Sequence, residues 1–155
     1  MDDFLLARVV HMIGVVLWIG GVAFVTLILL PGLKGLQPPG ERLAMFERLE
    51  NGFAWQARLT TLLTGVSGLY MLYVLDAWER FGDPGYWWLH AMSALWLVFT
   101  LMLFVLEPLV LHKWFARRAR SQPDRTLALI QRLHWVLLTA SLITVAGAVA
   151  GVHGG

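Results

Sequence analysis

The chain has no cysteine among its 155 residues. This absence excludes a disulfide framework, an iron–sulfur cluster, a thiolate copper site and the C-x-x-C-H attachment of a covalent haem. Any metal or cofactor site must therefore use histidine, methionine, carboxylate or backbone ligands.

Charged residues are also scarce, at 14% of the chain against 58% hydrophobic residues, whereas a soluble domain carries about 25% charged residues. The mean hydropathy is +0.67. P-loop, G-x-S-x-G and dinucleotide-binding patterns are absent, so those nucleotide and hydrolase sites are excluded. The net charge of +2 does not indicate nucleic acid. This balance is typical of a small polytopic membrane protein.

Apolar residues gather in segments that meet or nearly meet the length of about 20 residues needed to cross a bilayer. The segments are residues 4–30, 54–75, 87–111 and 127–152. They predict an all-α fold, a bundle of four transmembrane helices that forms one integral membrane domain over residues 1–155. The first segment begins beside Asp2 and Asp3 and has no small-residue cleavage site, so we expect it to stay as a helix and not to act as a signal peptide.

Prolines divide the predicted helices. Pro31 is expected to end the first helix, because proline cannot continue the backbone hydrogen-bond ladder. The Pro38-Pro39-Gly40 run is expected to break the following loop, and residues 41–52 suit a short amphipathic surface helix. Residues 121–124 resemble a turn and cap before the last helix.

Basic residues are concentrated in the first and third predicted loops, which carry Lys34, Arg42, Arg48, Arg58, Lys113, Arg117, Arg118, Arg120 and Arg125. The loop between the second and third helices has only Arg80 among several carboxylates. The positive-inside rule places the two basic loops in the cytoplasm. We therefore expect a bacterial inner-membrane protein with both termini in the periplasm.

Two histidines lie inside the predicted spanning segments, His11 in the first and His90 in the third. Ionisable groups are rare inside a bilayer and are candidates for function. His11 lies about 10 Å and His90 about 5 Å below the outer ends of their helices at 1.5 Å per residue. Imidazoles at similar depth on two helices suit the two axial positions of a haem iron. The alternative is that each imidazole forms a hydrogen bond with a neighbouring backbone, threonine or serine group of the bundle.

Three residues share the helical face of His11. Arg8 suits a haem propionate, or else lipid head groups. Gly14 admits either a flat macrocycle or a neighbouring helix, and Trp18 either stacks on a ring cofactor or fills the core.

Other ionisable residues lie toward the cytoplasmic side. His112 and His134 are candidates for a secondary site, and His134 also suits a proton path or a simple bond within the bundle. Glu107 needs a partner inside the membrane, and Arg58 or Arg132 is expected to supply it.

The pattern His11-x6-Trp18-Ile19-Gly20-Gly21 resembles the first helix of CopD-like membrane proteins and of HemJ-type protoporphyrinogen oxidases. Trp88-Leu89-His90-Ala91 resembles the start of the third helix of the HemJ type. The resemblance covers most of the chain through short motifs. It implies a four-helix bundle that binds non-covalent haem b, with His11 and His90 as the corresponding histidines. The HemJ pattern has lysine where this chain has Met92, which favours electron transfer over porphyrinogen oxidation.

The predicted function is therefore that of a haem b membrane protein that exchanges electrons with quinone or a periplasmic carrier. The alternatives are an oxidoreductase of the HemJ type, a copper-handling protein of the CopD class and a structural subunit. Whether the chain is an enzyme, and whether it forms a homo-oligomer, is left open by the sequence.

Overall fold

The computed structural model describes residues 3–33, 39–111, 114, 117–118 and 122–152, and within them every regular element is a helix. The elements are α1 (Asp3–Phe24), η1 (Val25–Leu29), α2 (Leu30–Leu33), α3 (Pro39–Val74), η2 (Ala77–Gly82), η3 (Pro84–Tyr86), α4 (Trp87–Leu101), η4 (Met102–Leu111) and α6 (Pro123–Val152). The all-α prediction is confirmed for these residues.

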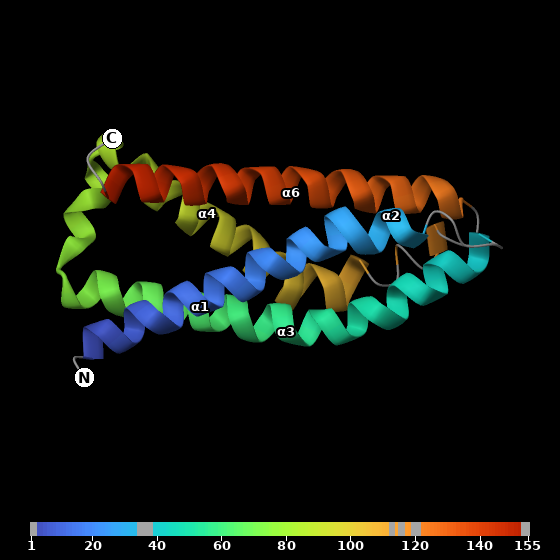
Figure 1. Cartoon of the computed structure of the whole chain (residues 1–155), viewed down its shortest axis with the longest axis horizontal. Coiled ribbons are helices and arrows are strands. Elements are labelled where there is room, and N and C mark those ends of the chain that lie inside the picture. The colour runs from blue at the N-terminus through green and yellow to red at the C-terminus, as the bar shows by residue number, and fades with distance from the viewer. Residues whose placement is uncertain (1–2, 34–38, 112–113, 115–116, 119–121, 153–155) are drawn as a thin grey trace.

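The long helices α1, α3, α4 and α6 run lengthwise through the molecule (Figure 1). The start of α1 and the end of α6 lie at the same end, together with the η2–η3 connection. α1 packs mainly against α3, and α4 packs mainly against α6. The bundle is therefore built from two helix pairs.

Three helical stretches are long and apolar enough to cross a membrane: Asp3–Leu33, Pro84–Leu109 and Pro123–Gly151. They match three of the four predicted spanning segments. α3 is not among them, and its second half, residues 57–74, carries Arg58 together with threonines, glycines and tyrosines among its apolar residues. The described part of the protein is thus all-helical, with three apolar helices suited to a bilayer.

The sequence had indicated that Pro31 ends the first helix. In the structure the helix continues past Pro31. The helix continues through α2 to Leu33 after the π-helical stretch η1. Pro108 lies inside a second π-helical stretch, η4. A proline ring clashes with the carbonyl four residues before it. In both helices that carbonyl lies in the wider π-helical turn, which accommodates the ring without ending the helix.

The predicted surface helix over residues 41–52 is not a separate element either. α3 begins at Pro39 and continues without interruption for 36 residues, about 54 Å at 1.5 Å per residue. Pro39 suits the first turn, where its missing N–H costs no hydrogen bond. α3 ends at Val74, and two residues later Asp76 adopts the left-handed conformation, with φ of 46°.

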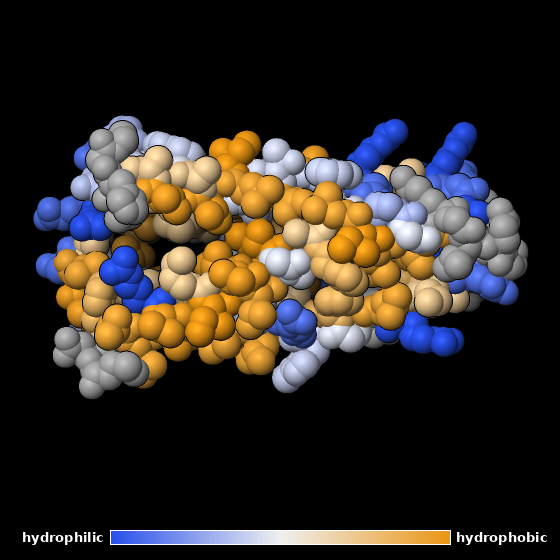
Figure 2. All heavy atoms as spheres, in the orientation of Figure 1, coloured by the Kyte–Doolittle hydropathy of each residue, from blue (hydrophilic) through white to orange (hydrophobic). Residues whose placement is uncertain are grey.

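The surface exposes many large apolar side chains, and several polar side chains are buried. Many large apolar side chains are exposed, such as Val16, Val66 and Val136. Among the residues that the structure describes, the buried polar ones are Thr26, Thr60, Thr61, Thr64, Ser67, Thr126, Gln131, Ser141 and Thr144. Figure 2 shows hydrophobic residues over most of the middle of one face, with charged residues mainly toward the ends. Such a surface suits contact with lipid.

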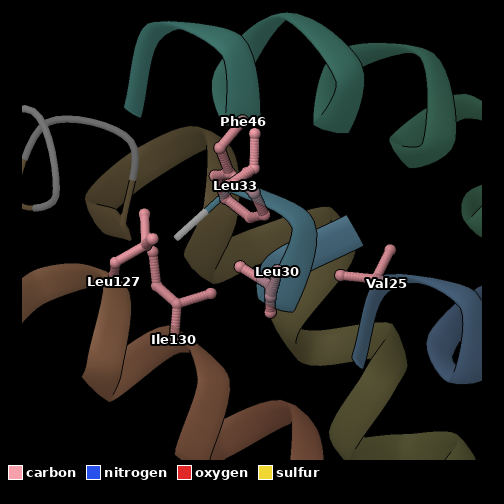
Figure 3. Packing of buried hydrophobic residues seen from close by; sticks show 6 residues of the cluster. All are labelled: Val25, Leu30, Leu33, Phe46, Leu127 and Ile130. Carbon is pink, nitrogen blue, oxygen red and sulfur yellow. The ribbon is translucent and has the colours of Figure 1, made fainter. Parts of the chain in front are cut away.

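A compact apolar core lies at the end opposite the termini. Val25, Leu30, Leu33, Phe46, Leu127 and Ile130 pack together from four elements (Figure 3). An ion pair between Arg42 and Asp124, at 3.2 Å, joins α3 to α6 at this end. These contacts fix the first half of α3 against the rest of the bundle.

Candidate functional site: a histidine between α1 and α3

His11 is held against α3 by its Nδ1 atom. Nδ1 lies 2.9 Å from the backbone oxygen of Thr64 and 3.3 Å from the hydroxyl of Ser67. The Ser67 hydroxyl itself donates to the carbonyl of Leu63, at 2.5 Å. The Thr64 carbonyl and the Ser67 hydroxyl oxygen therefore both accept a hydrogen bond from His11. The ring proton must then reside on Nδ1.

The other ring nitrogen of His11 has a different environment. Within the described part of the chain, Nε2 has no hydrogen-bond partner. A neutral imidazole with its proton on Nδ1 has a lone pair on Nε2. A histidine that ligates a metal usually donates its other N–H to a carbonyl or carboxylate, which fixes the tautomer and the ring. His11 has this arrangement, so its donor chemistry fits a haem iron.

Glycines allow the close contact around His11. A Cβ on Gly68 would lie 3.2 Å from Cε1 of His11, and one on Gly14 would lie 2.5 Å from the Thr64 hydroxyl. Of the two roles predicted for Gly14, the structure shows the helix contact. This contact brings the α3 carbonyl within reach of His11.

His90 lies in the first turn of α4 and is exposed. Its Nδ1 faces the carbonyl of Tyr86 at 3.2 Å, and its Nε2 faces the carbonyl of Phe81 at 3.0 Å. The Phe81 ring also packs edge-on against the imidazole. In this structure His90 therefore bonds to the η2–η3 connection.

The structure does not join His11 to His90 by a hydrogen bond or ring contact in the described residues. α1 and α4 meet deeper in the bundle, where Trp18 packs edge-on against Phe99 with ring centroids 4.8 Å apart. Trp18 thus fills the core, one of its two predicted roles. Nearer the termini, the surface in Figure 2 is hollowed between the α1 side and the α6 side.

The remaining predicted residues, where the structure describes them, form no hydrogen bond with His11. Arg8 is exposed on α1, and neither of the ion pairs among the described residues includes it. His134 is half-buried on α6 and its Nδ1 donates to the carbonyl of Ile130, at 2.9 Å. His112 lies outside the described residues.

Glu107 pairs with Arg58, one of its two predicted partners, at 3.3 Å. Arg58 also donates through Nε to the carbonyl of Leu103, at 3.2 Å. The pair joins the middle of α3 to η4. It satisfies the charge of an acidic side chain beside Pro108.

Thr64, Ser67 and Gly68 were not among the residues predicted to form the site. The sequence contained a usable pattern, because Thr60, Thr61, Thr64 and Ser67 follow one another at helical spacing in an apolar segment. Polar residues on one face of a helix in lipid are expected to face its partners.

Among the described residues there is no group of three or more histidine and carboxylate side chains that could hold a metal ion. A haem iron needs no such cluster, since it takes only its axial ligands from side chains. Comparison of the chain with protein-family models, curated proteins and solved structures found no match.

Proposed function

We propose that this chain is a four-span membrane protein that binds haem b in its outer half and passes electrons to or from quinone or a periplasmic carrier. The observation that carries the proposal is that a carbonyl of α3, that of Thr64, engages Nδ1 of His11 on α1 and leaves its Nε2 for a metal. The short motifs around His11 and His90 resemble the CopD-like and HemJ-type families and support the same cofactor.

The side chains of α3 support its crossing of the bilayer in spite of its modest hydropathy. Its buried residues are Thr60, Thr61, Thr64 and Ser67, and its exposed residues over the same turns include Leu59, Leu62, Leu63 and Val66. The hydroxyls that lower the mean hydropathy therefore face the bundle, and the leucines face outward. A helix of this kind presents an apolar surface to lipid.

His11 would supply one axial ligand through Nε2, since Nδ1 is engaged with Thr64. His90 would supply the second through its own Nε2. This requires the imidazole to leave the carbonyl of Phe81 while Nδ1 keeps its bond to Tyr86. Each ligand would then have a backbone carbonyl behind it, which orients the ring.

Bound haem b would supply reversible one-electron chemistry. Held by a histidine from each of two helices, the iron would have no position left for a substrate, which would favour electron transfer over catalysis at the metal. The contribution of this chain is to fix His11 and to surround it with apolar helices. Arg8 and Arg80 are exposed toward the same end and suit an anionic partner.

The test is the visible spectrum of the detergent-purified protein, oxidised and reduced. We expect the bands of a b-type haem. His11→Ala should abolish or convert them, and His90→Ala should change the spectrum through loss of the second ligand.

His134→Ala is the matched control, because His134 is also half-buried and also donates Nδ1–H to a backbone carbonyl. It should keep the wild-type spectrum. The proposal is wrong if the His11→Ala and His90→Ala proteins both retain full haem with unchanged bands. Copper uptake that depends on a haem-free chain would instead favour the copper-handling alternative.

A further inference from the structure

Two of the described helices combine a proline with a π-helical stretch. Pro31 follows η1, and Pro108 lies inside η4. In a π-helix the N–H of each residue bonds to the carbonyl five residues earlier. Because proline has no N–H, Pro31 leaves the carbonyl of Thr26 without its usual donor, and Pro108 leaves that of Leu103. Buried carbonyls without a partner are rare in folded proteins.

The hydrogen bonds of η1 show this spacing directly. The N–H of Leu30 bonds to the carbonyl of Val25, five residues before it. The next N–H along the chain would bond to the carbonyl of Thr26, and that position is Pro31. The Thr26 carbonyl therefore needs a donor from outside its own helix.

In both helices a side chain from another helix supplies the donor. Gln131 of α6 donates through Nε2 to the carbonyl of Thr26 at 2.8 Å, and both residues are buried. Arg58 of α3 donates through Nε to the carbonyl of Leu103 at 3.2 Å. In each case the acceptor is the carbonyl five residues before the proline. The same match on two separate helices indicates that these side chains replace the missing proline N–H.

Both contacts cross from one helix pair to the other. α1 packs mainly against α3, and α4 mainly against α6. Gln131 extends from α6 to η1, which continues α1, whereas Arg58 extends from α3 to η4, which continues α4. Polar contacts between helices in lipid add directional bonds to van der Waals packing. A bond to one particular carbonyl therefore fixes how the two pairs lie along each other.

We propose that Gln131 and Arg58 are latches, each of which replaces the N–H that a proline lacks and thereby locks the two helix pairs in register. The candidate histidines belong to different pairs, His11 to α1 and His90 to α4. The latches therefore also set the position of one histidine relative to the other. Only this last consequence rests on the proposed function, since the latches themselves need no cofactor.

The latch at η1 lies beside the apolar core. Val25 and Leu30 pack in the same cluster as Ile130, the neighbour of Gln131 in the chain (Figure 3). Thr26 has no exposed surface, so water cannot replace Gln131 as the donor. Loss of this side chain leaves the carbonyl unpaired.

The latch at η4 has a second acceptor close by. Arg58 also pairs with Glu107, at 3.3 Å. The guanidinium therefore keeps a partner when it leaves the carbonyl of Leu103. We expect the η4 latch to be released more easily than the η1 latch.

The first experiment is a double-mutant cycle on thermal unfolding of the full chain in detergent. Gln131→Leu should lower the Tm by several degrees when position 31 is proline. Pro31→Ala supplies an N–H within the helix, so the same Gln131→Leu change should then cost much less. Coupling of this kind measures the pairwise interaction itself.

Thr126→Val is the matched control on α6. Thr126 is also buried, but its hydroxyl donates to the carbonyl of Gln122 in the same helix. Its loss of Tm should be the same with Pro31 and with Pro31→Ala. Equal losses for Gln131→Leu in the two backgrounds would overturn the assignment of Gln131 to the proline.

The second latch gives an independent cycle if the Gln131→Leu chain does not fold. Arg58→Lys keeps a positive charge for Glu107 but removes the Nε–H that reaches Leu103. It should lower the Tm more with Pro108 than with Pro108→Ala. Equal losses in the two backgrounds would count against the proposal in the same way.

The second experiment measures register, by electron-spin resonance distances between spin labels on introduced cysteines. Labels at Val16 and Val136 report on different pairs, whereas labels at Val16 and Val66 report on one pair, and all three positions are exposed. Gln131→Leu should broaden or shift the Val16–Val136 distance distribution and leave the Val16–Val66 distribution unchanged. Thr126→Val should change neither.

An unchanged Val16–Val136 distribution in the Gln131→Leu protein, or equal broadening of both distributions, would overturn the role of the latch in register. Both experiments use the chain without added haem. Their outcome is therefore distinct from that of the spectra of the His11→Ala and His90→Ala proteins, and the two proposals fail separately.

Discussion

At the scale of single residues, the contact between α1 and α3 depends on a missing side chain. Gly14 lies against the hydroxyl and backbone of Thr64 and the carbonyl of Thr60. The same approach brings His11 to the Thr64 carbonyl. A second glycine of α1, Gly20, has no atom within 4 Å of its notional Cβ and is exposed. The two glycines therefore have different roles in one helix.

Gly14→Ala should destabilise the protein by about 1–3 kcal/mol, the usual cost of overpacking. The reason is that the new Cβ would lie 2.5 Å from the Thr64 hydroxyl, which forces α1 away from α3. Thermal unfolding in detergent, followed by circular dichroism, measures the change.

Gly20→Ala is the control in the same helix. It should be neutral or stabilising by up to about 1 kcal/mol, because alanine is the better helix former. Equal stabilities of the two variants would contradict the close contact at Gly14.

At the scale of elements, α3 is defined by its two ends. Pro39 begins the helix, and Asp76, just after it, reverses the chain in the left-handed region with φ of 46°. Aspartate tolerates this conformation better than most residues, and β-branched residues tolerate it poorly. Beyond Asp76, η2 carries the Phe81 carbonyl that faces His90. The end of α3 thus positions the connection that holds His90.

Asp76→Val should lower stability by about 1–2 kcal/mol, the cost of the left-handed conformation for a side chain with a Cβ branch. Asp76→Asn, which accepts the same backbone angles, should be near neutral, and Asp76→Gly should be neutral or stabilising. The measurement is again the unfolding transition in detergent. A Val variant as stable as the Asn variant would show that the chain reverses by another geometry.

At the scale of the whole molecule, the termini and the η2–η3 connection lie at one end and the start of α3 at the other (Figure 1). In the sequence, the basic residues of the first and third loops lie in the segments that connect the helices at the end where α3 begins. The positive-inside rule therefore predicts that both termini lie outside. This prediction requires α3 to cross the bilayer.

The absence of native cysteine makes this orientation directly measurable. Single cysteines at exposed positions should react with a membrane-impermeant thiol reagent from one side only. Asp83→Cys should be labelled in intact spheroplasts, whereas Glu41→Cys and Gln122→Cys should be labelled only after permeabilisation. Labelling of Glu41→Cys and Asp83→Cys from the same side would show that α3 does not cross. The reverse pattern at all three positions would invert the topology.

Much of the helical layout could be predicted from apolar run lengths, because lipid permits few alternatives for a backbone that must satisfy its own hydrogen bonds. The Glu107 partner was also predictable, since an acid in an apolar segment needs a nearby base. The effect of Pro31 was not, because a π-helical turn can accommodate the ring and sequence reasoning does not foresee it. Gly14 and Trp18 each had two predicted roles, and only their neighbours Thr64 and Phe99 distinguished them.

The sequence by itself determined the class of the molecule: an all-helical chain with apolar segments and loops whose basic charge favours one orientation. These are local or compositional properties, and each depends on residues close together in the chain. Only the tertiary structure decided which ring nitrogen of His11 is engaged, because Thr64 and Ser67 lie more than fifty positions away on another helix. Likewise, only the packing of the helices brought Gln131 to the carbonyl of Thr26 and Arg58 to that of Leu103. Hydrogen bonds and close contacts depend on atoms from segments distant in the chain, so their geometry exists only once the helices have packed.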